Sequence, residues 1–157
     1  MANWLWRRGA PGEQGFSLVE LLIVVIIMGV LSAIAIPLFF QQRANAADAA
    51  AEADVRHLGG ELSRIWIEAT AATAVTVAQV GNAYQITVVN GSEVETAGTP
   101  RSRNVELQPT SHMESVKSWC VGVTNLQGKV QNYAWTGAGE MEAGGVCDTS
   151  GGTATKP

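Results

Sequence analysis

The segment that decides the fold runs from Gly15 to Phe40 and reads GFSLVELLIVVIIMGVLSAIAIPLFF. After Glu20 it contains no charged residue. A helix of about 20 apolar residues, at ~1.5 Å rise per residue, is long enough to cross the hydrocarbon core of a bilayer. Gly29 and Pro37 interrupt the run, but both residue types are tolerated in membrane helices. The segment therefore predicts one membrane-spanning helix over residues 16–40.

The residues that precede the span, 1–15, do not form an ordinary secretory signal. An ordinary signal peptide carries its apolar run before the cleavage point, whereas here the apolar run follows the Gly15–Phe16 junction. Arg7 and Arg8 flank the span on its N-terminal side. The positive-inside rule then leaves the N-terminus in the cytoplasm and the rest of the chain outside. We expect a 15-residue leader and a single span in the cytoplasmic membrane.

Residues 41–70 continue the helical pattern without a stop signal. Small and apolar residues recur every three or four positions, at Ala44, Ala47, Ala51, Val55, Leu58, Leu62, Ile65 and Ala69. The opposite face offers two i,i+4 ion pairs, Glu52 with Arg56 and Arg64 with Glu68. We expect an amphipathic continuation of the same helix, weakened by about 1 kcal/mol per residue at Gly59–Gly60.

Residues 71–157 have the composition of a small β-rich globular head. The pattern predicts about four strands, at residues 73–80, 82–89, 116–124 and 130–136. The first two are joined by a Gly81–Asn82 turn, which favours a hairpin. Residues 90–104 are predicted to be a loop, and the Gly-rich tail from Gly137 to be irregular. The expected fold is α+β, with a small antiparallel sheet packed on the second half of the long helix.

The two cysteines, Cys120 and Cys147, both lie in the last third of the chain. Because this part is predicted to be exported across a membrane, the pair favours a disulfide. The alternative is two separate buried thiols. In the strand predicted at residues 116–124, Cys120 faces away from Trp119, Val121 and Val123.

Composition argues against several classes of function. The net charge is −4, and the leader, with Arg7, Arg8 and Glu13, carries +1, so the mature chain has −5. A mildly acidic chain without a basic cluster predicts no direct nucleic-acid binding. The chain has no Cys/His set with zinc spacing, no P-loop and no nucleophile-elbow motif. We therefore predict no catalytic residue, no metal site and no cofactor.

The junction Gly15–Phe16, the acid Glu20 and the run Ala33-Ile-Ala-Ile-Pro37 together resemble the type IV pilin and pseudopilin family. The resemblance covers Gly15 to about Arg43. It implies that an integral-membrane aspartyl prepilin peptidase cuts after Gly15 and N-methylates Phe16. The chain would then be a prepilin with a pilin-like fold.

The resemblance also implies roles for residues inside the span. Glu20 would pair with the Phe16 α-amino group of a neighbouring subunit during assembly, because a lone carboxylate at the edge of lipid is costly. The alternative is that Glu20 simply sits among lipid headgroups. Gly29 and Pro37 resemble the family's helix-loosening segment, although an ordinary kinked span would look the same. Cys120 and Cys147 resemble its C-terminal disulfide-bounded region.

The function that these expectations favour is a structural subunit of a type IV pilus. Its partners would be other copies of itself in a helical filament, the prepilin peptidase, the pilus assembly platform and, before assembly, membrane lipid. The mature chain would pass from the cytoplasmic membrane to an extracellular pilus. A minor pilin or a type II secretion pseudopilin shares every N-terminal feature. A single-span membrane-anchored enzyme or binding protein is a third reading, but it leaves the Gly15–Phe16 junction and Glu20 unexplained.

Overall fold

A computed structural model describes residues 15–69, 73–148 and 154–155. It divides into two compact units, one ending at Phe39 and the other beginning at Phe40. A single helix, α1 (Leu18–Glu68), runs through both units. The predicted α+β class, with a long apolar N-terminal helix and antiparallel sheets, is confirmed.

The first unit contains the apolar half of α1. All side chains from Phe16 to Phe40 are exposed in the isolated chain. The helix is long and apolar enough to cross a membrane. Pro37 lies inside the helix. Because proline has no backbone N–H, the helix lacks one i→i−4 hydrogen bond at this point.

In the second unit α1 provides the centre of the hydrophobic core. Its buried apolar residues recur every three or four positions, at Ala51, Val55, Leu58, Leu62 and Trp66. This is largely the predicted stripe. At its end the predicted Ile65 and Ala69 are half-buried and pack against this core, and Trp66, which lies outside the predicted positions, is buried.

The exposed face of α1 carries two ion pairs. The predicted pair between Glu52 and Arg56 is confirmed, with a nitrogen–oxygen distance of 2.8 Å. Arg64, however, pairs with Glu61 at 3.2 Å instead of with Glu68. Both i,i+3 and i,i+4 neighbours lie within reach on a helix surface, so spacing alone did not separate the two acids.

A three-stranded antiparallel sheet follows α1, with strand order β1–β2–β3. Its strands are β1 (Thr73–Val80), β2 (Ala83–Asn90) and β3 (Glu93–Pro100). The predicted β1–β2 hairpin is confirmed, with Gly81 at φ 58° in its turn. The predicted loop at residues 90–104 was wrong, because β3 lies within it. Almost all of β3 is exposed on both faces, so its sequence lacks the apolar alternation that marks a strand.

A five-stranded antiparallel sheet is built around β6 (Ser118–Thr124) and β7 (Asn132–Thr136). These are the strands predicted at 116–124 and 130–136, each shorter at its start. The sheet also contains β4 (Glu106–Leu107), β5 (His112–Ser115) and β8 (Met141–Ala143). A two-stranded sheet joins β9 (Val146–Cys147) to β10 (Ala154–Thr155).

The predictions of about four strands in a single sheet, and of an irregular tail, were wrong. The described residues form ten strands in three sheets. Most of the missed strands have only two to four residues. Such short strands leave no periodic signal in the sequence.

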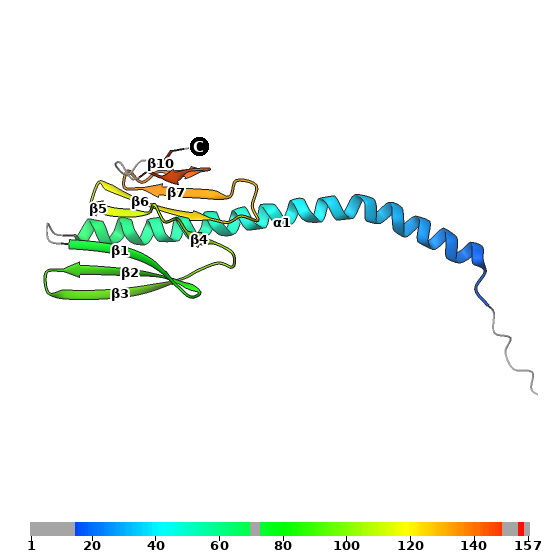
Figure 1. Cartoon of the computed structure of the whole chain (residues 1–157), viewed down its shortest axis with the longest axis horizontal. Helices are drawn as coiled ribbons and strands as arrows, with labels where there is room; N and C mark the ends of the chain where they lie inside the picture. Colours follow the sequence, from blue (N-terminus) through cyan, green and yellow to red (C-terminus); the bar gives the residue numbers. More distant parts are fainter. Residues whose placement is uncertain (1–14, 70–72, 149–153, 156–157) are drawn as a thin grey trace, which may run out of the picture. The chain divides into compact units, whose positions relative to one another are not determined.

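The second half of α1 lies between the three-stranded and five-stranded sheets (Figure 1). On the β2 side, buried Asp54 accepts hydrogen bonds from the Tyr84 hydroxyl at 2.9 Å and from the Ser102 hydroxyl at 2.7 Å. On the β7 side, Gly59 lies against Trp135, where an added Cβ would come within 2.4 Å of the indole. The predicted weak point at Gly59 is therefore a close-packing position.

Candidate processing and assembly site

The N-terminal end of α1 is organised by Ser17 and Glu20. Residues 15–17 are not helical, and the helix begins at Leu18. The backbone N–H of Ser17 donates to Glu20 Oε2 at 3.4 Å, and the N–H of Leu21 donates to the Ser17 carbonyl at 3.2 Å. This is one half of a capping box, in which the third helical residue reaches back to the N-cap residue.

Sequence reasoning missed Ser17, although a signal was available. The pattern Ser-x-x-Glu directly before an apolar run is typical of a helix N-terminus. Glu20 is therefore both an ionisable group beside the span and a local cap at the start of α1. In the isolated chain the carboxylate also lies near the positive end of the helix dipole. Among the described residues, no cation pairs with it.

The glycines of this segment have open surroundings. A Cβ added at Gly15 or at Gly29 would meet no atom within 4 Å. Neither glycine is therefore required by packing within the chain. A requirement for glycine at position 15 would therefore come from an enzyme that binds the Gly15–Phe16 junction. A requirement for glycine at position 29 would come from the stability of the helix or from its contacts with other molecules.

The second candidate region is the disulfide between Cys120 on β6 and Cys147 on β9, with Cα atoms 5.7 Å apart. Cys120 and Cys147 pack with Ala134 in a small cluster. The neighbouring residues on β6, Trp119 and Val121, belong to the main core on the other face, as the alternation predicted.

Buried Gln108 holds the segment that carries Cys147. Its Oε1 accepts the backbone N–H of Cys147 at 3.2 Å. Its Nε2 donates to the carbonyls of Val123 and Gly145, both at 3.3 Å. Gly122 leaves room for this amide, because a Cβ there would come within 2.0 Å of Oε1. Sequence reasoning gave no indication of Gln108, since its partners are backbone groups brought together only by the fold.

Two further polar groups of the second unit, Tyr84 and His112, have structural partners. Burial, with a contribution from the Asp54 carboxylate, raises the pKa of Tyr84 far above the ordinary tyrosine value. His112 Nδ1 lies 3.1 Å from the Thr110 carbonyl. In the described part of the chain, no group of three or more His, Cys, Asp and Glu side chains could hold a metal ion.

Comparison with known families finds a match in the N-terminal segment. Residues 11–36 match the prokaryotic N-terminal methylation motif. The match includes Gly15, Phe16, Glu20 and Gly29, and ends one residue before Pro37. Comparisons with curated proteins and with solved structures gave no match.

The N-terminal segment thus carries the prepilin signature of the type IV pilins and pseudopilins. The motif points to a structural subunit and not to an enzyme. Together with the apolar half of α1, it fits a protein anchored in a membrane.

Proposed function

We propose that the mature chain is a structural subunit of a type IV pilus, polymerised through the first half of α1. The observation that carries the proposal is the methylation motif at residues 11–36, which ends inside an apolar helix suited to a membrane. Cleavage after Gly15 and methylation of Phe16 would produce the mature subunit. The prepilin peptidase and a pilus assembly platform are the partners that this route requires.

Before assembly, lipid is the partner of the first half of α1. Its apolar side chains are exposed in the isolated chain, and a bilayer is the medium in which they are stable. The Arg7–Arg8 pair favours a cytoplasmic N-terminus, which leaves the β-rich head outside. During assembly, the same side chains would exchange lipid for the helices of other copies.

In the filament Glu20 has a role that the isolated helix does not provide. Cleavage creates a cation, the α-amino group of Phe16, at the same end of the helix. Burying either charge alone in a packed apolar bundle is costly, whereas a close pair with good geometry offsets much of that cost. A staggered neighbour can bring its Phe16 amine to Glu20, so pairing would guide docking and fix the register.

The deciding experiment is mass spectrometry of sheared surface filaments. We expect the chain as a major component, with an N-terminal peptide that begins at methylated Phe16. A processed chain that stays in the membrane, or is a trace component, would favour a minor pilin or a type II secretion pseudopilin. An intact 15-residue leader on exported protein would contradict processing. As a control, Gly15→Val should block the cut and leave the uncut chain in the membrane.

A further inference from the structure

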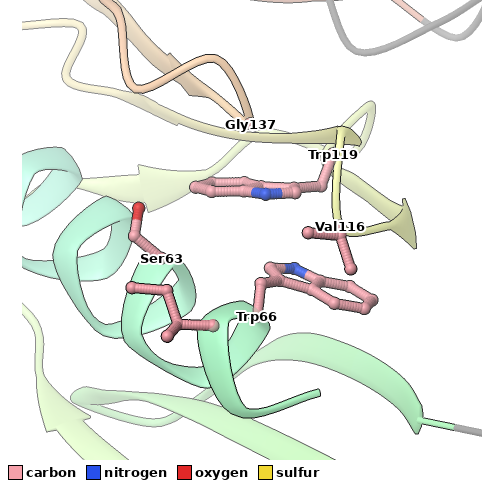
Figure 2. A pocket seen from close by; sticks show the side chains of 6 residues that line it. Ser63, Trp66, Val116, Trp119 and Gly137 are labelled. Carbon is pink, nitrogen blue, oxygen red and sulfur yellow. The ribbon is translucent and has the colours of Figure 1, made fainter. Parts of the chain in front are cut away.

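Two hollows of the second unit differ in size and chemistry. The hollow in Figure 2 lies between the indoles of Trp66 and Trp119 and has a volume of about 200 Å³. Small-molecule sites usually occupy roughly 300–1,000 Å³, so this hollow is below their range. A second hollow has a volume of about 470 Å³, which lies within that range. We call it the arginine pocket, and its lining residues are Asn82, Arg101, Arg103 and Asn104.

The segment after β3, residues 101–105, supplies most of this lining and is held in place by hydrogen bonds. The backbone N–H of Arg101 donates to the Asn82 carbonyl at 3.0 Å, which joins the segment to the turn between β1 and β2. The N–H and hydroxyl of Ser102 donate to the buried Asp54 carboxylate at 2.9 and 2.7 Å. The N–H of buried Val105 donates to the Ser102 carbonyl at 3.3 Å and closes a turn whose third residue has φ 62°, as in a type II turn. The pocket is therefore formed before any ligand arrives.

The two arginines of the pocket keep N–H groups without a partner. Arg101 Nη1 donates to the Val105 carbonyl, which orients the guanidinium. Arg101 Nε is buried and out of reach of a ligand, but Nη2 is not buried and remains a donor. Arg103 is exposed, and within the described ranges neither arginine forms an ion pair. Because Arg101 is already oriented, binding does not have to order this long side chain.

Two acids beside the pocket limit its positive charge without occupying the arginines. Asp54 is buried, and its oxygens accept hydrogen bonds from Tyr84 and Ser102. Glu106 is exposed and, with Asn104, lines a different hollow. Their charges offset much of the field of the two guanidinium groups. The pocket therefore suits a ligand with a single negative charge better than one with two.

The lining side chains define the chemistry of that ligand. A guanidinium group presents parallel N–H donors that match the two oxygens of a carboxylate. The amides of Asn82 and Asn104 both donate and accept, which suits hydroxyl groups. No apolar residue lines the pocket, so an apolar ligand would gain little there. A small carboxylate that carries several hydroxyl groups satisfies all four side chains.

We propose that the arginine pocket binds a carboxylated sugar, such as a uronic acid. The carboxylate accepts from the Arg103 fork and from Arg101 Nη2, and the sugar hydroxyls bond to Asn82 and Asn104. The site is exposed and water competes for it, so the dissociation constant should be on the order of 1 mM. The site lies within the second unit, and its existence does not depend on the proposed filament function.

The test is an NMR titration of the ¹⁵N-labelled full-length chain in detergent with D-glucuronate. We expect saturable shifts of the backbone N–H signals of Asn82 and residues 101–104. D-Glucose and sodium chloride at the same concentrations should cause no such shifts, and inorganic phosphate should bind more weakly than glucuronate. Shifts that do not saturate, or that sodium chloride reproduces, would overturn the site. Phosphate binding as tight as that of glucuronate would overturn the assignment of the ligand.

A set of variants tests the role of the guanidinium fork. Arg103→Gln breaks no bond within the described residues and should weaken glucuronate binding at least about fivefold. Arg103→Lys keeps the charge but loses the fork, so it should recover only part of the affinity. Lys117→Gln is the matched control, because it removes an exposed positive charge elsewhere on the head and should leave binding unchanged. Unchanged affinity in Arg103→Gln, or an equal loss in Lys117→Gln, would contradict the proposal. Signals from outside residues 101–105 check that each variant folds.

Discussion

At the scale of single residues, Glu20 has two possible partners. In the isolated chain it accepts the Ser17 backbone N–H and lies at the positive end of α1. In a filament, the Phe16 amine of a neighbour would compete for the same carboxylate. The bond to Ser17 is long and exposed, so it is weak. A carboxylate held this loosely remains available for a stronger charged partner.

Removing that carboxylate should separate assembly from processing. Glu20→Ala should insert and be cleaved normally, because the span stays apolar, but filament yield should fall below half that of the wild type. Glu20→Gln should do little better if charge is the cause. Ser17→Ala is the control, since it leaves the carboxylate in place and should assemble nearly as the wild type does. Filament yield in sheared fractions is the measurement, and wild-type yield for Glu20→Ala would leave Glu20 as a headgroup-level residue.

Tyr84 makes the stability of the head sensitive to alkaline pH. Burial, with the nearby Asp54 carboxylate, raises the pKa of Tyr84, so the folded state disfavours the phenolate. The unfolded chain ionises at about pH 10. The stabilising contribution is therefore complete below that pH and is lost as pH rises above it. Thermal unfolding of the full-length chain in detergent should show this loss, and Tyr84→Phe should reduce it. Tyr133, whose pKa burial also raises, should account for part of the remainder.

What could be predicted at this scale depended on the distance to a residue's partner. The importance of Gly15, Phe16 and Glu20 could be inferred because the motif is contiguous. Asp48, Asp54 and Gln108 could not, because their partners are tens of residues away in the sequence and are mostly backbone N–H or C=O groups. No side-chain pattern in the sequence marks such a partner.

At the scale of elements, α1 was the easiest to predict and β3 the hardest. The helix has a long apolar run followed by an amphipathic stripe, and both patterns are strong over many residues. Strand β3 is held by pairing with β2 and has little buried side-chain surface. Its existence depends on the preceding turn, where Gly91 adopts φ 63°. Backbone pairing of that kind leaves little trace in composition.

The adjacent glycines of α1 should respond oppositely to the same substitution. Gly59→Ala places a methyl group against Trp135 and should destabilise the head by about 1–3 kcal/mol. Gly60→Ala meets no atom within 4 Å and should stabilise it by up to about 1 kcal/mol, because alanine favours the helix. Chemical denaturation of the two full-length variants checks both values. Equal effects would show that helix propensity, and not packing, determines the stability of this turn.

At the scale of the whole molecule, the C-terminal segment is held to the head in two ways, by the disulfide and by Gln108. Closing a loop of 27 residues should stabilise the fold by roughly 3–4 kcal/mol in the chain-entropy model. Loss of the Gln108 side chain leaves buried backbone groups unpaired, at a cost of about 1–3 kcal/mol. Both effects act on the position of Cys147, so they should not be independent.

A double-mutant cycle tests that dependence. Cys147→Ala and Gln108→Ala should each destabilise the full-length chain, and the double variant should lose less than the two losses added together. Gln127→Ala, at an exposed position, is the control and should change stability by less than about 0.5 kcal/mol. Strict additivity would show that Gln108 supports β6 and not the disulfide segment. Cleavage after Gly15 should be unaffected in all four chains.

The hydrogen bonds of Asp48 would also matter in the proposed filament when it is under tension. A pulling force transmitted along α1 from Phe40 would reach the loop between β6 and β7, residues 125–131, at Ala47 and Asp48 before it reaches the buried core that begins at Ala51. Three backbone N–H groups share one carboxylate there, so the first strain is distributed over several parallel bonds. The disulfide lies outside this path, because both of its cysteines belong to the strands and neither to the helix. Mechanical strength and covalent crosslinking are therefore separate properties of this head, and reduction of Cys120–Cys147 would leave the first point of resistance to stretching in place.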